Sequence, residues 1–339
     1  MPPAPLVSVL LSVRDGEATL TDALASLSQQ SLTVWEAVVM DDGSSDATPV
    51  ILGDAARKDS RFRVFTRPAR GLVASLNEGL SLCRAPLIAR MDADDLSHPE
   101  RLEKQYRWML DHPDTGVAGC LVAYAGHDPD AHGYRRHVDW LNTLVDADAI
   151  NRCRFIDSPL ANPSTVFRRG LISIHGAYRE GDIPEDYDFW LRLLDAGVRM
   201  EKVPETLLTW RDSPGRLTRT HPHYRAEAFA RLKAEWFDIW WRRHGAGRSV
   251  WLWGAGLESR KRARPLLGLG LPAEAWIDID PKKIGRELYG LPIYPVEQLP
   301  SPGQAVVLVL AGAWDVREII LGQLRERGFR EGEDAFAFC

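Results

Sequence analysis

Three groups of acidic side chains in the first two thirds of the chain are spaced closely enough to bind a cation or move a proton. They are Asp41–Asp46, Asp92–Asp95 and Glu185–Asp188. The three carboxylates of Asp92-Ala93-Asp94-Asp95 repel one another unless a cation or hydrogen-bond donors offset their charge. Mg²⁺ and Mn²⁺ are typically held by one or two carboxylates together with substrate phosphates. The first two groups together suit a metal-bound nucleotide diphosphate.

Short β-rich runs alternate with helical patterns around these acids. Strands are expected over 7–13, 35–40, 63–65 and 86–91, and helices over 19–27, from about 46, and over 72–82. This alternation predicts an α/β fold with a mostly parallel sheet flanked by helices. Ligands of such sheets lie at the carboxyl ends of strands, beside the switch in strand order. Two of the acidic groups directly follow the second and fourth strands, so we expect them to share this edge.

Each acidic group also has a purely structural interpretation. Asp41–Asp46 suits a glycine turn followed by a helix N-cap. Glu185–Asp188 leads into apolar residues at helical spacing, and a helix dipole favours carboxylates in its first turn. Any one group could be structural, but the occurrence of all three in one sheet-type domain favours a functional site.

Over about residues 5–240 the chain resembles glycosyltransferase family 2, whose members have the GT-A fold. The matching segments are Val7–Leu11, Asp41–Asp46, Gly71-Leu72 with Asn77, Arg90–Asp95, Pro99–Leu102, Pro163–Arg169 and Pro184–Leu194. A DxD pair alone is a weak signal, whereas this ordered set is specific.

The resemblance implies an inverting transfer of sugar from a nucleotide-diphosphate sugar to an acceptor hydroxyl. Asp186 matches the general base, Asp94 the ligand of Mn²⁺ or Mg²⁺, and Asp92 the ribose or metal contact. Asp42 would bind the nucleotide base. Further contacts to the nucleotide sugar are expected from residues spread over the domain, namely Ser12, Arg14, Asn77, Arg90, Glu185 and Arg211.

Two segments depart from the family pattern. Ser12-Val13-Arg14-Asp15 stands where an aromatic side chain often stacks on the base, although the planar guanidinium of Arg14 could stack instead. Asn162-Pro163 replaces a frequent His-Pro. Family frequency favours a UDP-sugar as donor. The expected acceptor is a glycan or lipid-linked molecule of cell-surface polysaccharide synthesis.

Two other function classes stay open from the residues alone. A nucleotidyltransferase that makes the sugar nucleotide also uses acidic metal ligands, but we find no glycine-rich phosphate loop after the first strand. A non-catalytic scaffold that binds sugar nucleotides would keep the binding residues without turnover.

Charge and composition define the domains and exclude one class of partner. Lys and Arg total 42 against 47 Asp and Glu, a net charge of −5, so no basic excess is available for nucleic acid. Residues 246–339 hold 12 basic and 12 acidic side chains, so the whole excess lies in residues 1–245. We therefore expect a GT-A domain over 1–245, with a helical tail at about 222–244, and a second domain over 246–339.

The second domain is predicted to be a small Rossmann-like α/β unit. A strand-like run leads into Gly254-Ala255-Gly256, but Ser259 stands where the dinucleotide fingerprint needs a third glycine. Gly254, Gly256 and Asp278 are candidates for a second nucleotide site. A packing or interaction module is the alternative.

Membrane contact and compartment are the remaining expectations. Trp236, Trp240 and Trp241 on one expected helix suit either packing or an interfacial aromatic belt, so peripheral association with the inner membrane face stays open. No run reaches the 18 apolar residues of a spanning helix. The four cysteines show no CxxC spacing, and no signal-peptide pattern is present. A cytoplasmic location is expected.

Overall fold

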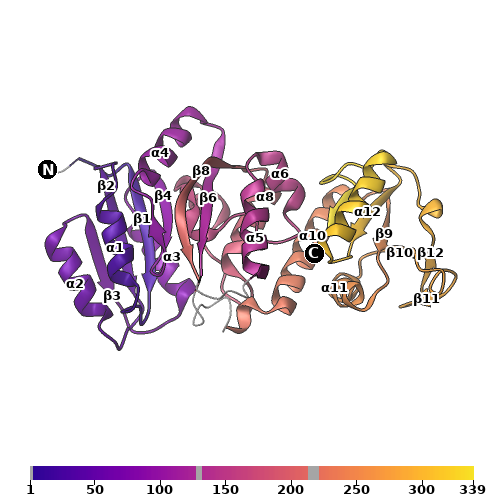
Figure 1. The fold of residues 1–339 in the computed structure, drawn as a ribbon, viewed down its shortest axis with the longest axis horizontal. Coiled ribbons are helices and arrows are strands. Elements are labelled where there is room, and N and C mark those ends of the chain that lie inside the picture. The colour runs from indigo at the N-terminus through magenta and orange to yellow at the C-terminus, as the bar shows by residue number, and fades with distance from the viewer. Residues whose placement is uncertain (1–2, 127–131, 213–220) are drawn as a thin grey trace. The chain divides into compact units, whose positions relative to one another are not determined.

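The computed structural model describes residues 3–126, 132–212 and 221–339. The chain divides into two compact units, and each is built from two segments. The first unit contains residues 1–147 and 159–221, and the second contains 148–158 and 222–339. Both combine a sheet with flanking helices (Figure 1), so the predicted α/β class is confirmed.

The first unit is organised around an eight-stranded sheet in the order β3-β2-β1-β4-β7-β6-β8-β5. The strands β1 to β4 run parallel, whereas β7 is antiparallel to both of its neighbours. The strands are β1 Val7–Val13, β2 Trp35–Asp41, β3 Phe62–Thr66, β4 Leu87–Asp92, β5 Leu96–Ser97, β6 Thr115–Ala125, β7 Val166–Arg168 and β8 Arg199–Arg211.

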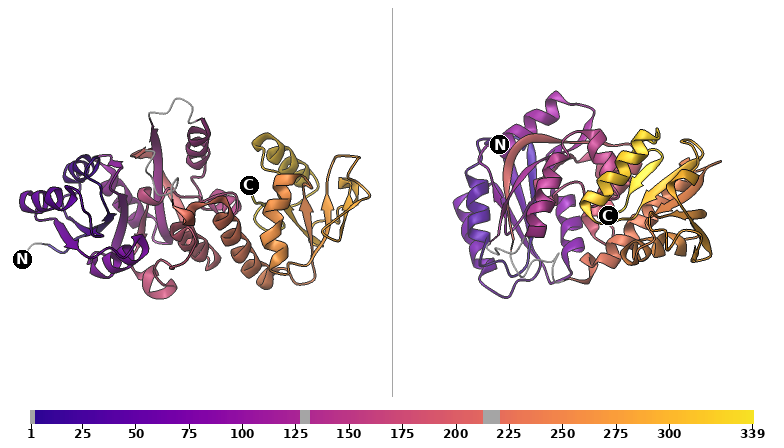
Figure 2. Two further views of the ribbon diagram at one scale, coloured as in Figure 1. Left: turned by 90° about the horizontal axis from the view of Figure 1, so that it is seen from below. Right: turned by 45° about the vertical axis from the view of Figure 1, so that its right-hand side comes forward.

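Helices flank this sheet and connect its parallel strands (Figures 1 and 2). They are α1 Leu20–Ser28, α2 Thr48–Lys58, α3 Leu72–Leu82, α4 Arg101–Asp111, α5 His132–Thr143, α7 Gly170–His175 and α8 Glu185–Asp195, with the short 3₁₀ turn η1 Asn162–Ser164. The strand β2 is buried along its whole length because helices cover both faces of a parallel sheet. This accounts for its continuous apolar run, Ala37 to Met40.

The second unit contains a six-stranded sheet in the order β11-β12-β10-β9-β13-β14. All its pairs are parallel except β11 with β12. Its elements are α6 Ala147–Cys153, the turn η2 Pro222–Tyr224, α10 Ala226–His244, β9 Ser249–Trp253, α11 Leu257–Gly268, β10 Ala273–Ile277, β11 Glu287–Leu288, β12 Leu291–Tyr294, the turn η3 Val296–Gln298, β13 Ala305–Val309, α12 Trp314–Glu326 and β14 Ala335–Ala337.

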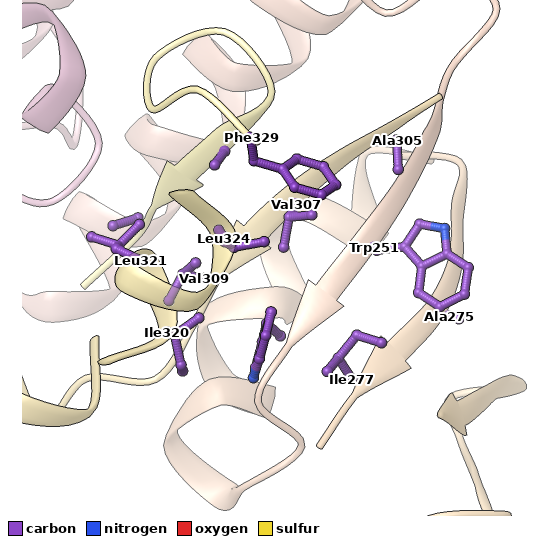
Figure 3. Packing of buried hydrophobic residues seen from close by; sticks show 13 residues of the cluster. Trp251, Ala275, Ile277, Ala305, Val307, Val309, Ile320, Leu321, Leu324 and Phe329 are labelled. Atoms are coloured by element: carbon purple, nitrogen blue, oxygen red, sulfur yellow. The ribbon is translucent and has the colours of Figure 1, made fainter. Parts of the chain in front are cut away.

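The core of the second unit follows from the alternation of side chains along its strands. One face carries Trp251, Trp253, Val307 and Val309, and α12 covers it with Ile320, Leu321 and Leu324 (Figure 3). The intervening residues of β9 and β13 face the other side and are also fully buried. Both faces are therefore covered, as in other parallel sheets.

The helix α10 belongs to the second unit rather than to the tail of the first, which differs from the boundary expected after residue 245. The physical reason is an aromatic cluster. Phe237 and Trp240 of α10 pack against Phe336, with ring centroids 5.6 and 4.5 Å away. Phe155, from the 148–158 segment, stacks on Phe338 at 5.1 Å. Trp240 therefore packs in the core of the second unit, which is the structural one of the two interpretations given for the helix with Trp236, Trp240 and Trp241.

Candidate active site

The carboxyl ends of the parallel strands bring the predicted residues to one edge of the first sheet. In the strand register Val13 pairs with Asp41, and Ser12 pairs with Asp92. The loops after β1, β2 and β4 therefore lie side by side. This juxtaposition is the one expected from the strand–helix alternation.

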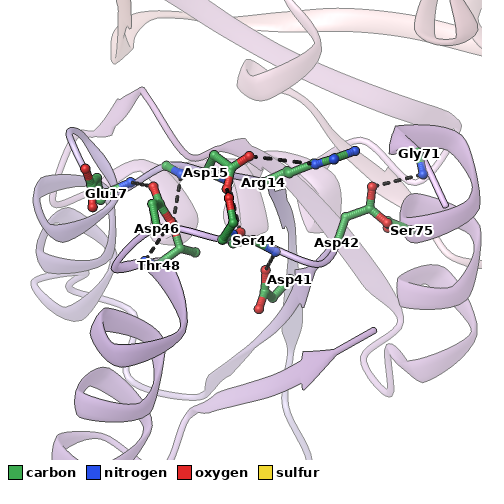
Figure 4. Close-up of polar contacts among 12 residues, drawn as sticks. Arg14, Asp15, Glu17, Asp41, Asp42, Ser44, Asp46, Thr48, Gly71 and Ser75 are labelled. Atoms are coloured by element: carbon green, nitrogen blue, oxygen red, sulfur yellow. Dashed lines mark hydrogen bonds and ion pairs between the residues drawn. The ribbon is translucent and has the colours of Figure 1, made fainter. Parts of the chain in front are cut away.

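The outer residues of the Asp41–Asp46 motif hold two of these loops together (Figure 4). Asp46 accepts hydrogen bonds from the backbone N–H groups of Glu17 and Thr48, both at 2.9 Å. Asp15 accepts one from the N–H of Ser45 at 2.7 Å. These carboxylates fix the backbone of the β1 and β2 loops, which is a structural role. The expected glycine turn is found at Gly43, with φ +73°, whereas the N-cap position of α2 is Ala47, which makes no side-chain cap bond.

Asp42 lies at the other end of the same motif, where its carboxylate meets the start of α3 (Figure 4). It accepts hydrogen bonds from the N–H groups of Arg70 at 2.8 Å and Gly71 at 2.9 Å, and from the Ser75 hydroxyl at 3.0 Å. A carboxylate offers about four lone-pair sites, so these three donors leave one, on a side chain that is 4% exposed. Its contact with the nucleotide base stays a prediction.

Ser12, predicted to contact the nucleotide sugar, and Arg14, predicted to stack on the base, lie at the end of β1. Ser12 is half-buried beside Asp92 in the strand register. Arg14 is exposed and pairs with Asp15 at 3.8 Å (Figure 4). The guanidinium of Arg14 is thus accessible to a ligand, and its predicted stacking on a base stays untested.

The loop after β4 holds the cluster of carboxylates that best fits a metal. Asp92, Asp94 and Asp95 each present an oxygen, and these oxygens lie within 4.8 Å of one another. Oxygen atoms are the ligands that hard divalent cations prefer. Asp92 and Asp94 are half-buried, whereas Asp95 is fully buried and accepts a hydrogen bond from the Arg211 N–H at 2.9 Å. The first two are therefore the accessible members of the cluster.

Arg90 and Arg211 both support this loop, Arg90 from a buried position and Arg211 from a partly exposed one. Arg90 is 1% exposed and donates to the Asp92 carboxylate at 2.9 Å and to backbone carbonyls of the strands. The Arg211 guanidinium bonds to the Asp94 carbonyl, to the Thr19 carbonyl at 3.2 Å and to Asp22 at 3.0 Å. Both were expected as nucleotide-sugar contacts, and the structure gives both a role in holding the loop. The neighbouring basic residues Arg216 and Arg219 lie outside the described part of the chain.

Asp186 is the second residue of the third acidic group, in the first turn of α8. Its carboxylate accepts a hydrogen bond from the Tyr187 N–H at 2.7 Å and keeps partial exposure, whereas Glu185 is buried. Burial, followed by the negative charge of Glu185, raises the pKa of Asp186 to about 8, while the charge of Arg90 lowers that pKa. A carboxylate with a pKa in this range can take up a proton near neutral pH.

Comparisons with known proteins identify the family and the fold. The family model described as "Glycosyl transferase family 2" matches residues 8–173. The amylovoran biosynthesis glycosyltransferase AmsE of Erwinia amylovora is 31% identical over 207 residues, which cover 60% of this chain and 75% of AmsE. The chain belongs to glycosyltransferase family 2. It is therefore a glycosyltransferase, and the nucleotidyltransferase alternative is set aside.

One further relative and one solved structure extend the comparison of this glycosyltransferase. An Escherichia coli UDP-Gal:alpha-D-GlcNAc-diphosphoundecaprenol beta-1,3-galactosyltransferase is 28% identical over 62% of this chain and 75% of its own length. The mannosyltransferase PcManGT of Pyrobaculum calidifontis, solved with GDP-Man and Mn²⁺, is 18% identical and superimposes with a TM-score of 0.53 over 79% of this chain and 70% of its own. At this identity PcManGT shows the shared fold, and the GT-A expectation is confirmed.

Two buried residues of the glycosyltransferase site had no role assigned from the sequence. Arg101 belongs to a quoted family segment and is fully buried, donating to the Arg90 carbonyl at 2.8 Å and to Gln105 at 3.0 Å. It fixes the end of β4 from α4. Tyr178 lies 97% buried, with its backbone bonded to Asn77. Asn77 was expected to contact the nucleotide sugar, but its amide is engaged by Tyr178.

The candidate second nucleotide site lies at the carboxyl ends of β9 and β10. Asp278 accepts hydrogen bonds from the Ala255 N–H at 2.8 Å, the Asp280 N–H at 2.9 Å and Lys283 at 3.0 Å. Gly254 has φ +109°, which favours glycine at this turn. The Asp278 carboxylate thus stabilises the loop that contains Gly254 and Gly256. A second nucleotide there stays a prediction.

Proposed function

We propose that this glycosyltransferase transfers a sugar from a nucleotide-diphosphate sugar to an acceptor hydroxyl, with inversion at the anomeric carbon. The observation that carries the proposal is Asp186: a partly exposed carboxylate with a raised pKa, grouped electrostatically with Arg90 and Asp92. A single base is sufficient for a direct displacement. Retention by double displacement would require a nucleophilic carboxylate as well.

In the proposed reaction Asp186 takes the proton of the acceptor hydroxyl as that oxygen bonds to the anomeric carbon. The bond between the anomeric carbon and the diphosphate oxygen breaks at the same time, and the nucleotide diphosphate leaves with the electron pair. Glu185 keeps the pKa of Asp186 high through its negative charge, which strengthens the base. Arg90 donates a hydrogen bond to Asp92 at 2.9 Å and so restrains that carboxylate.

Asp94 and Asp92 are the residues that we propose for binding Mn²⁺ or Mg²⁺. Their oxygens lie within 4.8 Å of each other, and both side chains retain exposure. The Arg211 guanidinium fixes the backbone of Asp94 through its carbonyl, which holds the loop ready for the ion. A bound divalent cation would neutralise the diphosphate as it leaves. PcManGT was solved with Mn²⁺, which supports this choice of ion.

The donor is proposed to be a UDP-sugar, and the relatives support two bases. The E. coli relative is named for UDP-Gal, whereas PcManGT was solved with GDP-Man. Asp42, Ser12 and Arg14 are the proposed contacts to the base. We propose a glycan or lipid-linked acceptor in polysaccharide synthesis, because AmsE is named for amylovoran biosynthesis and the E. coli relative for a diphosphoundecaprenol substrate.

Such an acceptor would be used at the cytoplasmic face of the inner membrane, by peripheral association. Among the described residues, no helix has the length and apolar character needed to cross a bilayer. Trp236 and Trp241, both half-buried, are the members of the tryptophan helix that remain candidates for membrane contact.

The pH dependence of turnover tests the role of Asp186. The base must be ionised, so kcat should rise about tenfold per pH unit below the pKa and level off above about pH 8. Hydrolysis of UDP-glucose, UDP-galactose, UDP-N-acetylglucosamine and GDP-mannose with Mn²⁺ first identifies the donor. The dependence of kcat on pH is then measured between about pH 5.5 and 9.5, a range of about 4 pH units that contains the expected rise and plateau.

Two results of that experiment would contradict the proposal. A kcat that is constant from the acid end of the range would mean that no group with a raised pKa must lose a proton. Tight binding of a donor without turnover in any acceptor panel would support the scaffold alternative. A control for donor affinity is the Kd at each pH, which should stay constant across the acid limb.

A further inference from the structure

The segment 175–179 crosses between two helices of the active site and is held from both. From α8, Arg192 donates to the carbonyls of His175 at 2.9 Å and Ala177 at 2.7 Å. From α3, Asn77 bonds to the backbone of Tyr178 on both sides: its Nδ2 donates to the carbonyl at 2.9 Å, and its Oδ1 accepts from the N–H at 3.0 Å. This pair fixes the orientation of the amide, because a flipped amide would face donor with donor and acceptor with acceptor.

Tyr178 packs against α8, so a shift of this segment would displace the helix that contains the proposed base, Asp186. Tyr178 is 97% buried, and its ring packs on Phe189 of α8 with centroids 5.1 Å apart. Phe189 follows Asp186 by three residues, so the two share one face of the helix. The charges that act on the Tyr178 hydroxyl are those of Asp186 itself and of Arg90, Glu185 and Asp92, and these last three also act on the Asp186 carboxyl.

The Tyr178 hydroxyl is buried and has no hydrogen-bond partner in the described structure. Burying a hydroxyl without a hydrogen-bond partner is unfavourable, because the group loses its hydrogen bonds to water and gains none in the protein. The tyrosine is therefore held in this position by its backbone and its ring, and the two Asn77 hydrogen bonds are the direct polar restraints on that backbone. The N-terminus of α3 is in turn held by the Asp42 carboxylate.

We propose that Asn77 is a positioning residue for turnover: its amide holds the Tyr178 segment against α8 and thereby sets the place of Asp186 relative to the acceptor. This inference rests on the proposed function, in which Asp186 is the base. It replaces the expectation that Asn77 contacts the nucleotide sugar. A displacement of about 1 Å at a reacting group can cost about 100-fold in rate, so a backbone restraint of this kind has a measurable effect.

The test separates turnover from donor binding in Asn77→Ala. We expect kcat to fall about 10- to 100-fold. The Kd values of UDP and GDP, each titrated with Mn²⁺ by calorimetry, should stay within about twofold. Asn77→Asp should lower kcat in the same way, because a carboxylate oxygen in place of Nδ2 cannot donate to the Tyr178 carbonyl and would repel it. Asn77→Ser, which keeps a small hydroxyl, should recover part of kcat and serves as the measured variant where Asn77→Ala does not fold.

The first unit contains a matched control, Asn142. Its amide makes the same two bonds, to the N–H of Val122 at 3.0 Å and to its carbonyl at 2.9 Å, on β6. Asn142→Ala therefore loses the same hydrogen bonds without touching the Tyr178 segment. It should lower Tm by a similar amount and leave kcat within about twofold of wild type.

Three results would overturn the inference. Loss of UDP or GDP affinity in Asn77→Ala by the same factor as kcat/KM would make Asn77 a nucleotide contact. A folded Asn77→Ala with kcat within twofold of wild type would remove its role. An equal loss of kcat in Asn142→Ala would reduce the effect to general stability. Full activity of Asp186→Asn would instead contradict the proposed base. Because this is a different variant, failure of the proposed function can be distinguished from failure of the Asn77 inference.

Discussion

Asp186→Asn is expected to lower kcat by about 10²- to 10⁴-fold while the variant stays folded and binds the nucleotide as wild type does. Asparagine has nearly the same shape, and its Oδ1 can still accept the 2.7 Å hydrogen bond from the Tyr187 N–H. It cannot take the acceptor proton. With a pKa of about 8, Asp186 is mostly protonated at neutral pH, so Tm should be unchanged there. Above about pH 8 the substitution removes a charge that lies beside Glu185 and Asp92, and Tm should be unchanged or higher.

The measurement is kcat for sugar transfer or donor hydrolysis, together with the Kd for UDP or GDP in the presence of Mn²⁺. Asp195→Asn, at the far end of α8, is the matched control and should keep wild-type turnover. A kcat within tenfold of wild type in a folded Asp186→Asn would contradict the assignment of the base. Loss of nucleotide affinity alone would instead place Asp186 in the donor site.

Asp94→Asn is expected to have the second-largest effect, a fall of about 10²- to 10³-fold in metal-supported turnover. A metal that neutralises a leaving diphosphate contributes several kcal/mol, and about 1.4 kcal/mol corresponds to tenfold. The amide keeps one oxygen but lacks the charge that binds the ion. Wild type treated with EDTA should lose turnover to a similar extent and regain it with Mn²⁺ or Mg²⁺.

The assay compares Mn²⁺ titrations of turnover in wild type, Asp94→Asn and the exposed control Asp114→Asn. The control removes a charge in the same unit, away from the cluster of Asp92, Asp94 and Asp95. An unchanged Mn²⁺ dependence in Asp94→Asn would exclude it as a ligand. Equal turnover of wild type in EDTA and in Mn²⁺ would contradict metal dependence altogether.

The placement of the acidic groups could be predicted from the sequence because parallel strands end at one edge of their sheet. The expected strand over 7–13 is found with the same bounds, and the expected helix over 72–82 likewise. Asp41 and Asp92 end their strands and Asp42 follows directly, so all three lie at the same edge of the sheet, as expected. The family resemblance then supplied the assignment of Asp186, which no spacing rule provides.

The partners of the individual side chains could not be predicted, since they depend on contacts between distant segments. Asn77 and Tyr178 are 101 residues apart, and Arg211 reaches Asp22 across 189. Arg90 lies in a strand whose two faces are buried, and nothing in its local pattern shows that its guanidinium turns to Asp92. The association of α10 with Phe155 likewise depends on aromatic packing that only the folded chain brings together.

The stereochemistry of donor hydrolysis tests the central claim, inversion with Asp186 as the only reacting carboxylate, and requires no knowledge of the acceptor. Proton NMR, recorded before the released sugar mutarotates, identifies the first anomer formed from the α-linked donor found in the panel. The proposed single displacement predicts the β anomer first, with its appearance abolished in Asp186→Asn. Release of the α anomer first would contradict it, because retention requires a different reacting group.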